Sequence, residues 1–239
     1  MKYYKITNET EIHNGLKYKA GLNVDPLPFN PSGDCLPGGI YYTDAKNICY
    51  FLGCGPWIRE VTLPKDAQVY QNPGIPLKWK ADKVKLGPRK KWCSVEVIKK
   101  LIKEGTDIHA GYDCTLRLAS YNGHLSAVKY LVKIGADIHV IHVCEDSPLR
   151  LASDRGHLNV VKYLVEQGAD IHADNDCALR MASNYGHLSV VKYLVKNGAD
   201  IHADNDCALR LASGNNHQNV VKFLKGKLNE DQKRICEQQ

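Results

Sequence analysis

The sequence predicts a mainly α protein, a solenoid of helical repeats that follows a small α+β domain. Two observations favour the solenoid: a Gly-x-Asp-Ile-His segment occurs four times, and a Leu-Arg-x-Ala-Ser block occurs four times in a constant phase with it. A third observation separates the two parts. Residues 1–91 hold 14 Lys+Arg and 8 Asp+Glu, whereas residues 92–239 hold 18 of each. The chain therefore divides near residue 91 into a basic domain and a neutral repeat array.

The composition is that of an ordinary folded protein, with 44% hydrophobic and 24% charged residues in 239. No run approaches the roughly 18 apolar residues that span a bilayer, and the start of the chain lacks the apolar region of a signal peptide. We therefore expect an intracellular protein that is not secreted and has no membrane segment. The nine cysteines are an odd number, and Cys114, Cys177 and Cys207 share one repeated position, so we expect reduced, buried small side chains.

The repeat itself contains two helices. Its Gly-x-Asp-Ile-His segment begins at residues 105, 135, 168 and 198, in steps of 30, 33 and 30. Between these landmarks, residues 188, 191, 194 and 195 are apolar and share one helical face. Gly198 ends this helix, because glycine enters the left-handed conformation without a Cβ penalty. A shorter helix on the Leu-Arg-x-Ala-Ser block precedes it.

This unit resembles the ankyrin repeat, and the copy with Ser147-Pro148-Leu149 and Gly156-His157-Leu158 is the most similar to the family pattern. The resemblance divides residues 92–239 into a half-unit at about 92–110 and units at about 111–140, 141–173, 174–203 and 204–233. In the half-unit, Gly87-Pro88 stands where a first helix should be, so only the helix from Ser94 to Glu104 is expected. After the interruption at Lys225-Gly226-Lys227, a capping helix is expected from Asn229 to Cys236.

The repeats depart from the family pattern in two ways. Arginine replaces the usual histidine of the first helix, and an aspartate precedes each arginine by four residues, at positions 113, 146, 176 and 206. This spacing predicts an aspartate that caps the helix and pairs with the arginine, forming an Asp/Arg ladder. Most units also lack three residues where the family has its finger, so the fingers should be short. Such repeats resemble those of giant amoebal DNA viruses of the mimivirus kind, which implies a place in the host cytoplasm or the virion.

Residues 1–91 are rich in Gly, Pro and Tyr. Strands are expected at Ile40–Thr43, Ile58–Leu63, Asp66–Tyr70 and Lys83–Leu86, and a helix at Asp44–Leu52 with Thr43 as its cap. The segments Gly38 to Asp44 and Arg59 to Pro64 resemble the module that accompanies ankyrin repeats in those viral proteins. A Gly-Ile-Tyr-Tyr-Thr strand before a helix also resembles the ADP-ribosyltransferases. That second resemblance implies an alternative, a nucleotide-binding or ADP-ribosyltransferase-like enzyme domain that the repeats target.

Residue chemistry favours a protein without catalysis, metal or cofactor. Eight histidines fall on two ladders, 109, 139, 172 and 202, and 124, 157, 187 and 217, whose members lie about one repeat, or roughly 10 Å, apart. We expect these histidines to bond turn backbone between units. No zinc-type cysteine pair, catalytic constellation or phosphate-binding loop is present. The basic run 78–91, which contains Trp79, leaves nucleic-acid binding as an alternative to a solvated strand or linker.

The resemblance to ankyrin proteins implies a non-catalytic scaffold that binds another protein through its concave surface, by fingertips and by the exposed ends of the first helices. The partner is an unidentified protein, with a host protein as one source. Tyr121, Arg155 and Tyr185 are the expected anchors, since binding energy concentrates in Tyr, Trp and Arg. An exposed tyrosine can equally be tolerated without a role. The candidate partner-binding residues are Tyr112, Tyr121, Asn122, His142, Asp154, Arg155, Asn184, Tyr185 and Asn215.

Overall fold

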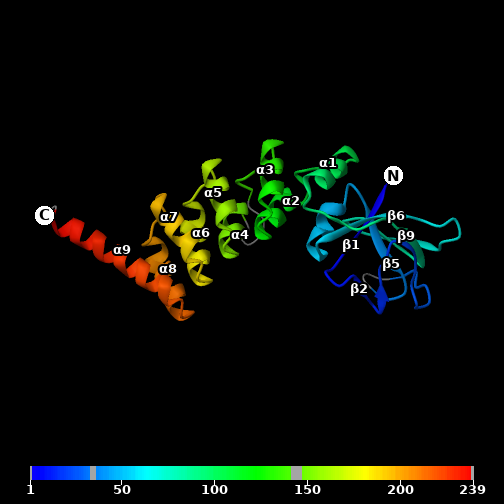
Figure 1. The fold of residues 1–239 in the computed structure, drawn as a ribbon, viewed down its shortest axis with the longest axis horizontal. Coiled ribbons are helices and arrows are strands. Elements are labelled where there is room, and N and C mark those ends of the chain that lie inside the picture. Colours follow the sequence, from blue (N-terminus) through cyan, green and yellow to red (C-terminus); the bar gives the residue numbers. More distant parts are fainter. Residues whose placement is uncertain (1, 33–35, 141–146, 238–239) are drawn as a thin grey trace. The chain divides into compact units, whose positions relative to one another are not determined.

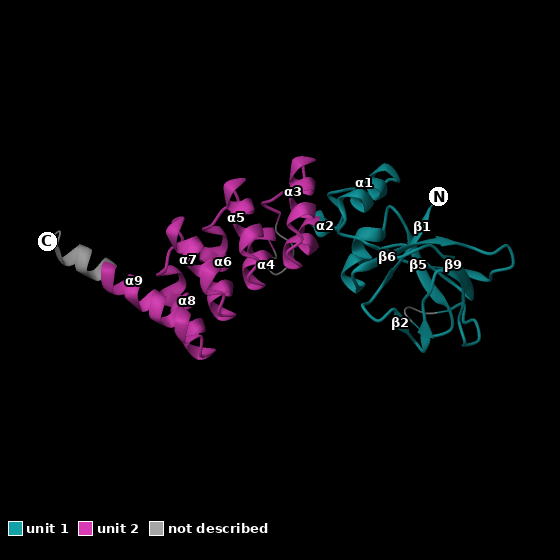
Figure 2. Ribbon diagram, viewed as in Figure 1, with its two compact units in different colours: residues 1–115 teal, residues 116–239 magenta. Residues whose placement is uncertain are grey.

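A computed structural model of the chain describes residues 2–32, 36–140 and 147–237, with side chains described to residue 230 (Figure 1). The chain forms two compact units, residues 1–115 and 116–239 (Figure 2). Unit 1 extends beyond residue 91, the end of the domain expected from the sequence, because helix α1 (Val95–Lys103) and the segment after it join the N-terminal sheet. The Tyr4 hydroxyl bonds the Glu104 carboxylate, and Thr106 Oγ1 donates to the Ala45 carbonyl over 2.5 Å.

Unit 1 is built around an antiparallel eight-stranded sheet with the order β4-β9-β6-β1-β5-β8-β7 and with β10 paired to β6. A separate hairpin joins β2 to β3. The long strands are rich in Tyr, Ile, Val and Thr, which suit a half-buried pleated surface. The strands are β1 (Tyr3–Thr7), β2 (Ile12–His13), β3 (Leu16–Lys17), β4 (Gly21–Val24), β5 (Ile40–Asp44), β6 (Trp57–Thr62), β7 (Val69–Asn72), β8 (Lys78–Ala81), β9 (Lys83–Leu86) and β10 (Lys90–Lys91).

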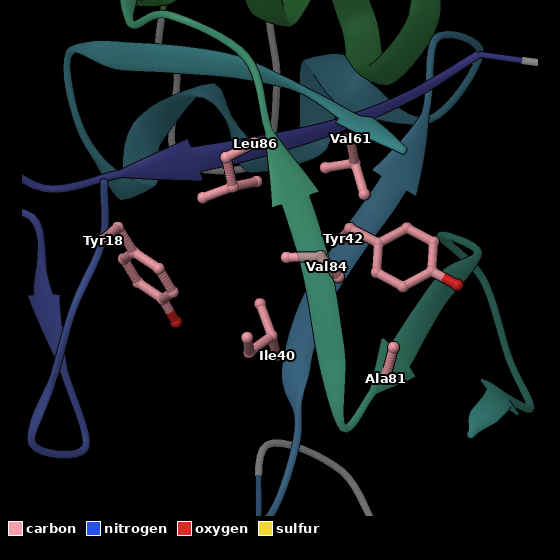
Figure 3. Close-up of a cluster of buried hydrophobic side chains, with 7 residues drawn as sticks. All are labelled: Tyr18, Ile40, Tyr42, Val61, Ala81, Val84 and Leu86. Carbon is pink, nitrogen blue, oxygen red and sulfur yellow. The ribbon is translucent and has the colours of Figure 1, made fainter. Parts of the chain in front are cut away.

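The core of unit 1 gathers side chains from four strands and from the segment before β4. Ile40 and Tyr42 come from β5 and Val84 and Leu86 from β9, each pair two residues apart and therefore on one face of its strand (Figure 3). Tyr42 also packs edge-on against Tyr3, with ring centroids 5.3 Å apart. Their burial excludes water from the inner face of the sheet and fixes the strand register.

Two expectations for unit 1 are wrong in detail. No α-helix covers Asp44–Leu52. Strand β5 instead continues through Thr43 and Asp44, because both residues pair with β1, and a 3₁₀ helix, η1, follows at Ile48–Cys54. The Asp44 carboxylate turns the chain by accepting the backbone N–H of Asn47 over 2.9 Å. The strand expected at Asp66–Tyr70 begins only at Val69. The other expected strands are present as β5, β6 and β9.

The repeats consist of paired helices. The first helices α4, α6 and α8 pack in sequence along one side of unit 2, and the second helices α3, α5 and α7, followed by α9, pack along the other (Figure 1). The helices after α1 are α2 (Ala110–Tyr121), α3 (Leu125–Lys133), α4 (Pro148–Asp154), α5 (Leu158–Glu166), α6 (Ala173–Asn184), α7 (Leu188–Lys196), α8 (Ala203–Gly214) and α9 (Gln218–Glu237).

The separate capping helix expected from Asn229 is wrong, because α9 runs without a break from Gln218 to Glu237. Gly226 lies inside it. A helical glycine costs only about 1 kcal/mol relative to alanine, which is too little to interrupt a helix whose first turns are packed. Val220, Val221 and Leu224 are buried where α9 packs against α8 and α7, and they supply that packing.

The short fingers take a specific form. Three consecutive residues in α2, α6 and α8 have left-handed backbone, and in α6 these are Asp174, Asn175 and Asp176 with φ of 51°, 51° and 55°. Asn and Asp enter this region more readily than other residues with a side chain. The three-residue deletion is thus accommodated by one compact left-handed turn, after which the right-handed first helix begins.

The left-handed turn also explains why the predicted Asp/Arg pairing is wrong. Because Asp176 does not lie on the same helical face as Arg180, its carboxylate accepts the backbone N–H of Asp200 in the next repeat over 2.9 Å. Arg180 instead bonds Asp174 over 2.9 Å and approaches Asp204 of the next repeat at 3.7 Å. An aspartate and an arginine thus meet across the units at Arg180, through the first aspartate of the turn, whereas Arg210 donates to the Asp204 carbonyl of its own turn over 3.0 Å. The Asp146 pair lies outside the described residues.

One histidine ladder joins adjacent repeats as expected. The Nε2 atoms of His157, His187 and His217 lie 3.0, 2.9 and 2.9 Å from backbone carbonyl oxygens of the preceding repeat. Burial lowers the pKa of His157, so its imidazole is neutral near pH 7. The other ladder acts differently. His172 Nδ1 lies 3.3 Å from Asp176 Oδ2, within its own repeat.

The second helices carry a further ladder that the sequence reading did not identify. The ammonium groups of Lys129, Lys162 and Lys192 lie 5.5, 5.9 and 5.8 Å from the centroid of an aromatic ring in the next repeat. The rings are those of Tyr163, Tyr193 and Phe223. Each such pair contributes about 0.5–1 kcal/mol at an exposed site. The Val-Lys-Tyr/Phe-Leu sequence that recurs in the second helices could have predicted these pairs.

Candidate protein-binding surface

Seven of the nine candidate residues lie where the first helices end, and we call them the first-helix row: Tyr121, Asn122, Asp154, Arg155, Asn184, Tyr185 and Asn215. The histidine ladder positions their backbone. The Nε2–H groups of His157, His187 and His217 donate to the carbonyl oxygens of Tyr121, Asp154 and Asn184 in the preceding repeat. Each histidine therefore fixes one end of a first helix, which makes the row a rigid part of the array.

Arg155 and Tyr121 are stacked. The guanidinium carbon of Arg155 lies 4.1 Å from the centroid of the Tyr121 ring, in the repeat before it. Arg155 Nε is also 3.4 Å from Asp154 Oδ2. The arginine is exposed and the tyrosine is half-buried beneath it. Arg155 thus covers part of the Tyr121 ring, and a partner at this point of the row would meet the guanidinium of Arg155 first.

Tyr185 is the most exposed aromatic side chain of the row, with a fractional exposure of 53%. Its ring lies 6.4 Å from the His187 ring with an interplanar angle of 26°. Beside it, Asn215 Nδ2 donates to Asn184 Oδ1 over 2.8 Å, which connects two repeats. Asn122 Nδ2 donates to the Leu118 carbonyl of its own helix. The row therefore offers an aromatic ring, a guanidinium and oriented amides.

The remaining two candidates are fingertip residues. Tyr112 belongs to unit 1 and is 61% exposed, with a left-handed φ of 56° and ψ of 61°. The equivalent positions of the later repeats hold Asn175 and Asn205, also left-handed. His142 lies outside the described residues.

The backbone of Tyr112 predicts an unusual stability change. We expect Tyr112→Asn to raise the free energy of unfolding of unit 1 by about 1 kcal/mol, because a left-handed conformation costs roughly 1–2 kcal/mol for residues other than Gly, Asn and Asp. The reciprocal change Asn175→Tyr should lower the stability of unit 2 by a similar amount. Urea titrations of both variants check this, and a destabilising Tyr112→Asn would contradict it.

The basic run 78–91 does not form a continuous exposed row. Lys80 is fully buried and donates to the Ser32 carbonyl over 3.2 Å. Lys83 pairs with Asp66 at 2.6 Å. Arg89 stacks on the Trp57 ring at 4.4 Å. Three of the bases are thus engaged within unit 1, which leaves fewer of them for phosphate contacts.

The part of the chain that the structure describes has neither a metal-binding cluster nor a membrane-spanning helix. It contains no group of three or more His, Cys, Asp or Glu side chains placed to hold a metal ion. Within the same residues, no helix combines the length and apolar character that crossing a membrane requires. Of the three cysteines expected to be buried, Cys177 and Cys207 are buried and Cys114 is only half-buried. Burial raises the pKa of Cys177.

Comparison with known proteins agrees with the geometry. A family model described as ankyrin repeats in three copies matches residues 91–175 and 172–235. Two ankyrin repeat proteins of Acanthamoeba polyphaga mimivirus are similar, at 38% identity over 143 residues and 36% over 140 residues, which are 56% and 53% of this chain. The aligned part spans 42% and 46% of those two relatives, less than half their length.

A third relative from the same virus, an uncharacterised protein, is 37% identical over 133 residues, which cover 96% of its length and 54% of this chain. The matched region, the two-helix units and the interlocking histidines all indicate ankyrin repeats. The chain therefore belongs to the ankyrin-repeat family, and the three relatives described here are mimivirus proteins.

Proposed function

We propose that the protein is a non-catalytic scaffold that binds another protein through the first-helix row, on the concave side of its repeats. Ankyrin repeats are a protein–protein interaction module, and the family membership carries this general role to the chain. The observation that carries the specific surface is the pairing of an exposed arginine, Arg155, stacked on Tyr121, with the exposed Tyr185 one repeat further on. Tyr and Arg are the residue types in which interface energy concentrates.

Rigidity supports this proposal. A surface that is already ordered loses less conformational entropy on binding. The carbonyls of Tyr121, Asp154 and Asn184 are each held by a histidine of the next repeat, so the helix ends that bear the row are ordered before a partner arrives. Stacking also restricts Arg155, whose side chain would otherwise lose considerable rotamer freedom in a complex.

The backbone of Tyr112 gives separate support for a fingertip contribution. Strained conformations persist where the surrounding structure imposes them, and they cluster at functional sites. Two later repeats avoid the cost by placing Asn175 and Asn205 at this position, whereas the first keeps an aromatic side chain there. Retention of Tyr112 is explained if its ring contacts a partner.

The proposal is tested by comparing two double variants. Arg155→Ala with Tyr185→Ala removes both exposed anchors, and we expect retention of a specific partner from host-cell lysate to fall at least tenfold, since anchor residues contribute about 2 kcal/mol or more each. The matched control is Glu166→Ala with Lys196→Ala, two exposed residues at the ends of second helices. Quantitative mass spectrometry of the retained proteins measures both.

The control should retain the partner like the parent chain. Equal retention by both double variants, with circular dichroism showing that both remain folded, would sink the first-helix row as the binding surface. Since the relatives are viral, host cytoplasm and virion are the compartments in which a partner should be sought.

A further inference from the structure

Unit 1 contains a cavity of about 230 Å³ whose lining includes residues of strands β1 and β5. Strand β1 pairs with β6 along its whole length, from Tyr3 to Thr7, but two residue pairs join it to β5, Tyr3 with Asp44 and Tyr4 with Thr43. Beyond Tyr4 the two strands diverge, and the cavity opens between them. Its volume lies just below that of typical small-molecule pockets, about 300–1,000 Å³.

The walls of this cavity are largely aromatic and apolar. Five aromatic residues line it: Tyr4, Tyr18, Tyr41, Tyr42 and Phe51. Such walls favour a flat or aliphatic ligand body, because burial of apolar surface is worth about 25 cal/mol per Å². The hydroxyl of Tyr42 is buried and, among the described residues, has no hydrogen-bond partner.

The charges of the lining have one sign. The charged side chains are those of Lys5 and Lys78, and among the described residues the lining includes no aspartate or glutamate. His13 also lines the cavity, and burial lowers the pKa of its imidazole. Lys5 is 7% exposed, and its Nζ donates to the Tyr41 carbonyl over 3.0 Å and lies 4.5 Å from the centroid of the Tyr18 ring. An ammonium has three N–H donors, so one carbonyl and one ring leave donor capacity.

The carboxylate that acts on Lys5 is engaged elsewhere. Asp25 attracts the Lys5 charge, but its carboxylate accepts the backbone N–H of Leu27 over 2.8 Å and of Gly39 over 2.9 Å. Among the described residues Lys5 forms no ion pair. A buried charge of this kind is unfavourable, and an anion entering the cavity would supply a counter-ion. Burial lowers the pKa of Lys5 to about 8, which agrees with this unfavourable environment.

We propose that the cavity between β1 and β5 binds a small amphiphilic monocarboxylate, with its apolar body against the tyrosines and its carboxylate on Lys5 Nζ. A single buried ammonium in an apolar cavity matches one negative charge. A phosphate dianion would carry a second charge that lacks a buried partner. The site is independent of the repeats and of the first-helix row.

Three probes of similar size and different charge test the assignment. Phenylbutyrate, phenylbutanol and phenylbutylamine are titrated into the full chain and followed by calorimetry. We expect the carboxylate to bind at least tenfold more tightly than the alcohol, and the amine to bind more weakly than either. Lys5→Met keeps the side-chain length, and it should abolish the preference for the carboxylate. Lys85→Met, at an exposed lysine of β9, should preserve it.

A pH series on the unaltered protein gives a second measurement, which does not depend on whether a variant folds. Phenylbutyrate should bind the form of the protein in which Lys5 is charged. Its apparent Kd should therefore rise about tenfold from about pH 7 to about pH 9, while the Kd for phenylbutanol stays constant. The groups facing Lys5 are Tyr18, Asp25, Cys54 and His13. The series is repeated in Cys54→Ser to exclude the thiol.

Three results would overturn the proposal: no binding of phenylbutyrate at millimolar concentration, equal affinity for the carboxylate and the alcohol, or a preference that survives Lys5→Met. Loss of the preference in Lys5→Met together with its retention in Lys85→Met, and the pH-dependent rise in Kd, would establish Lys5 as the anion-binding group.

Discussion

Gly156→Ala is expected to lower the free energy of unfolding of the repeat array by about 3 kcal/mol. Gly156 has a left-handed φ of 71°, and a Cβ at this position would lie 2.5 Å from His187 Nδ1 in the next repeat. The backbone conformation alone costs alanine about 1 kcal/mol. The clash would also displace His187 from the Asp154 carbonyl, and loss of this partly buried hydrogen bond and of the packing around it should cost about a further 1–2 kcal/mol.

Gly168→Ala is the matched control for this effect. Gly168 belongs to the same repeat and has φ of 91°, but a Cβ there would meet nothing within 4 Å. Gly168→Ala should lower the free energy of unfolding by about 1 kcal/mol, because the alanine adopts the left-handed conformation but meets no clash. Urea unfolding followed by far-ultraviolet circular dichroism measures the two variants. Equal losses in both would mean that the interlocked histidine contributes nothing beyond backbone conformation.

The same experiment separates the two units spectroscopically. The chain has three tryptophans, Trp57, Trp79 and Trp92, and all lie in unit 1. Tryptophan fluorescence therefore reports on the unfolding of unit 1, whereas most of the helical signal comes from the repeats. Gly156→Ala should shift the helical transition and leave the fluorescence transition in place.

The repeats were predictable from the sequence because their contacts are local and periodic. The expected helix faces agree with the buried Val191 and Leu194. Of the two histidine ladders, the one that contains His187 contacts backbone between units as its position predicts, whereas His172 contacts an aspartate of its own repeat. The form of the finger was not predictable. The deletion of three residues was visible, but a run of left-handed residues such as Asp174 to Asp176 changes which side chains face one another, and helical spacing rules then fail.

The sheet of unit 1 was only partly predictable, since polar side chains are buried in it. Strand β1 was not expected, because Lys5 and Thr7 are buried beside Tyr4 and no alternation of apolar and polar residues marks the strand. Strand β8 likewise contains a fully buried lysine, Lys80. The cavity depends on where two strands diverge, which is a property of tertiary pairing that no local pattern encodes.

A buried ion pair holds the start of this sheet together. Arg59 on β6 and Glu11 after β1 are 5% and 6% exposed. Arg59 Nε and Nη2 donate to the two carboxylate oxygens of Glu11 over 2.8 and 3.0 Å, and Nη1 donates to the Gly87 carbonyl over 2.7 Å. Such a bidentate pair is strong because both charges are hydrogen-bonded in a setting with little water.

Arg59→Met is expected to lower the free energy of unfolding of unit 1 by about 3–5 kcal/mol, since it leaves the Glu11 carboxylate buried without its main partner. The loss should depend on pH. Hydrogen bonding from Arg59 holds the pKa of Glu11 below its usual value, so the pair stabilises the protein above about pH 4.5 and this contribution falls as the pH drops through the folded-state pKa. The difference between the parent chain and Arg59→Met should therefore shrink in acid.

Two further variants show whether the unpaired charge is the cause. Arg89→Met removes the half-exposed base that lies 3.3 Å from Glu11 Oε2, and it should cost about 1 kcal/mol or less. The double variant Glu11→Leu with Arg59→Met removes both charges and should recover a large part of the stability lost in Arg59→Met alone, because no buried charge then lacks a partner. Tryptophan fluorescence in urea measures all three. A double variant less stable than Arg59→Met would show instead that the shape of the two side chains, and not the uncompensated carboxylate, determines the loss.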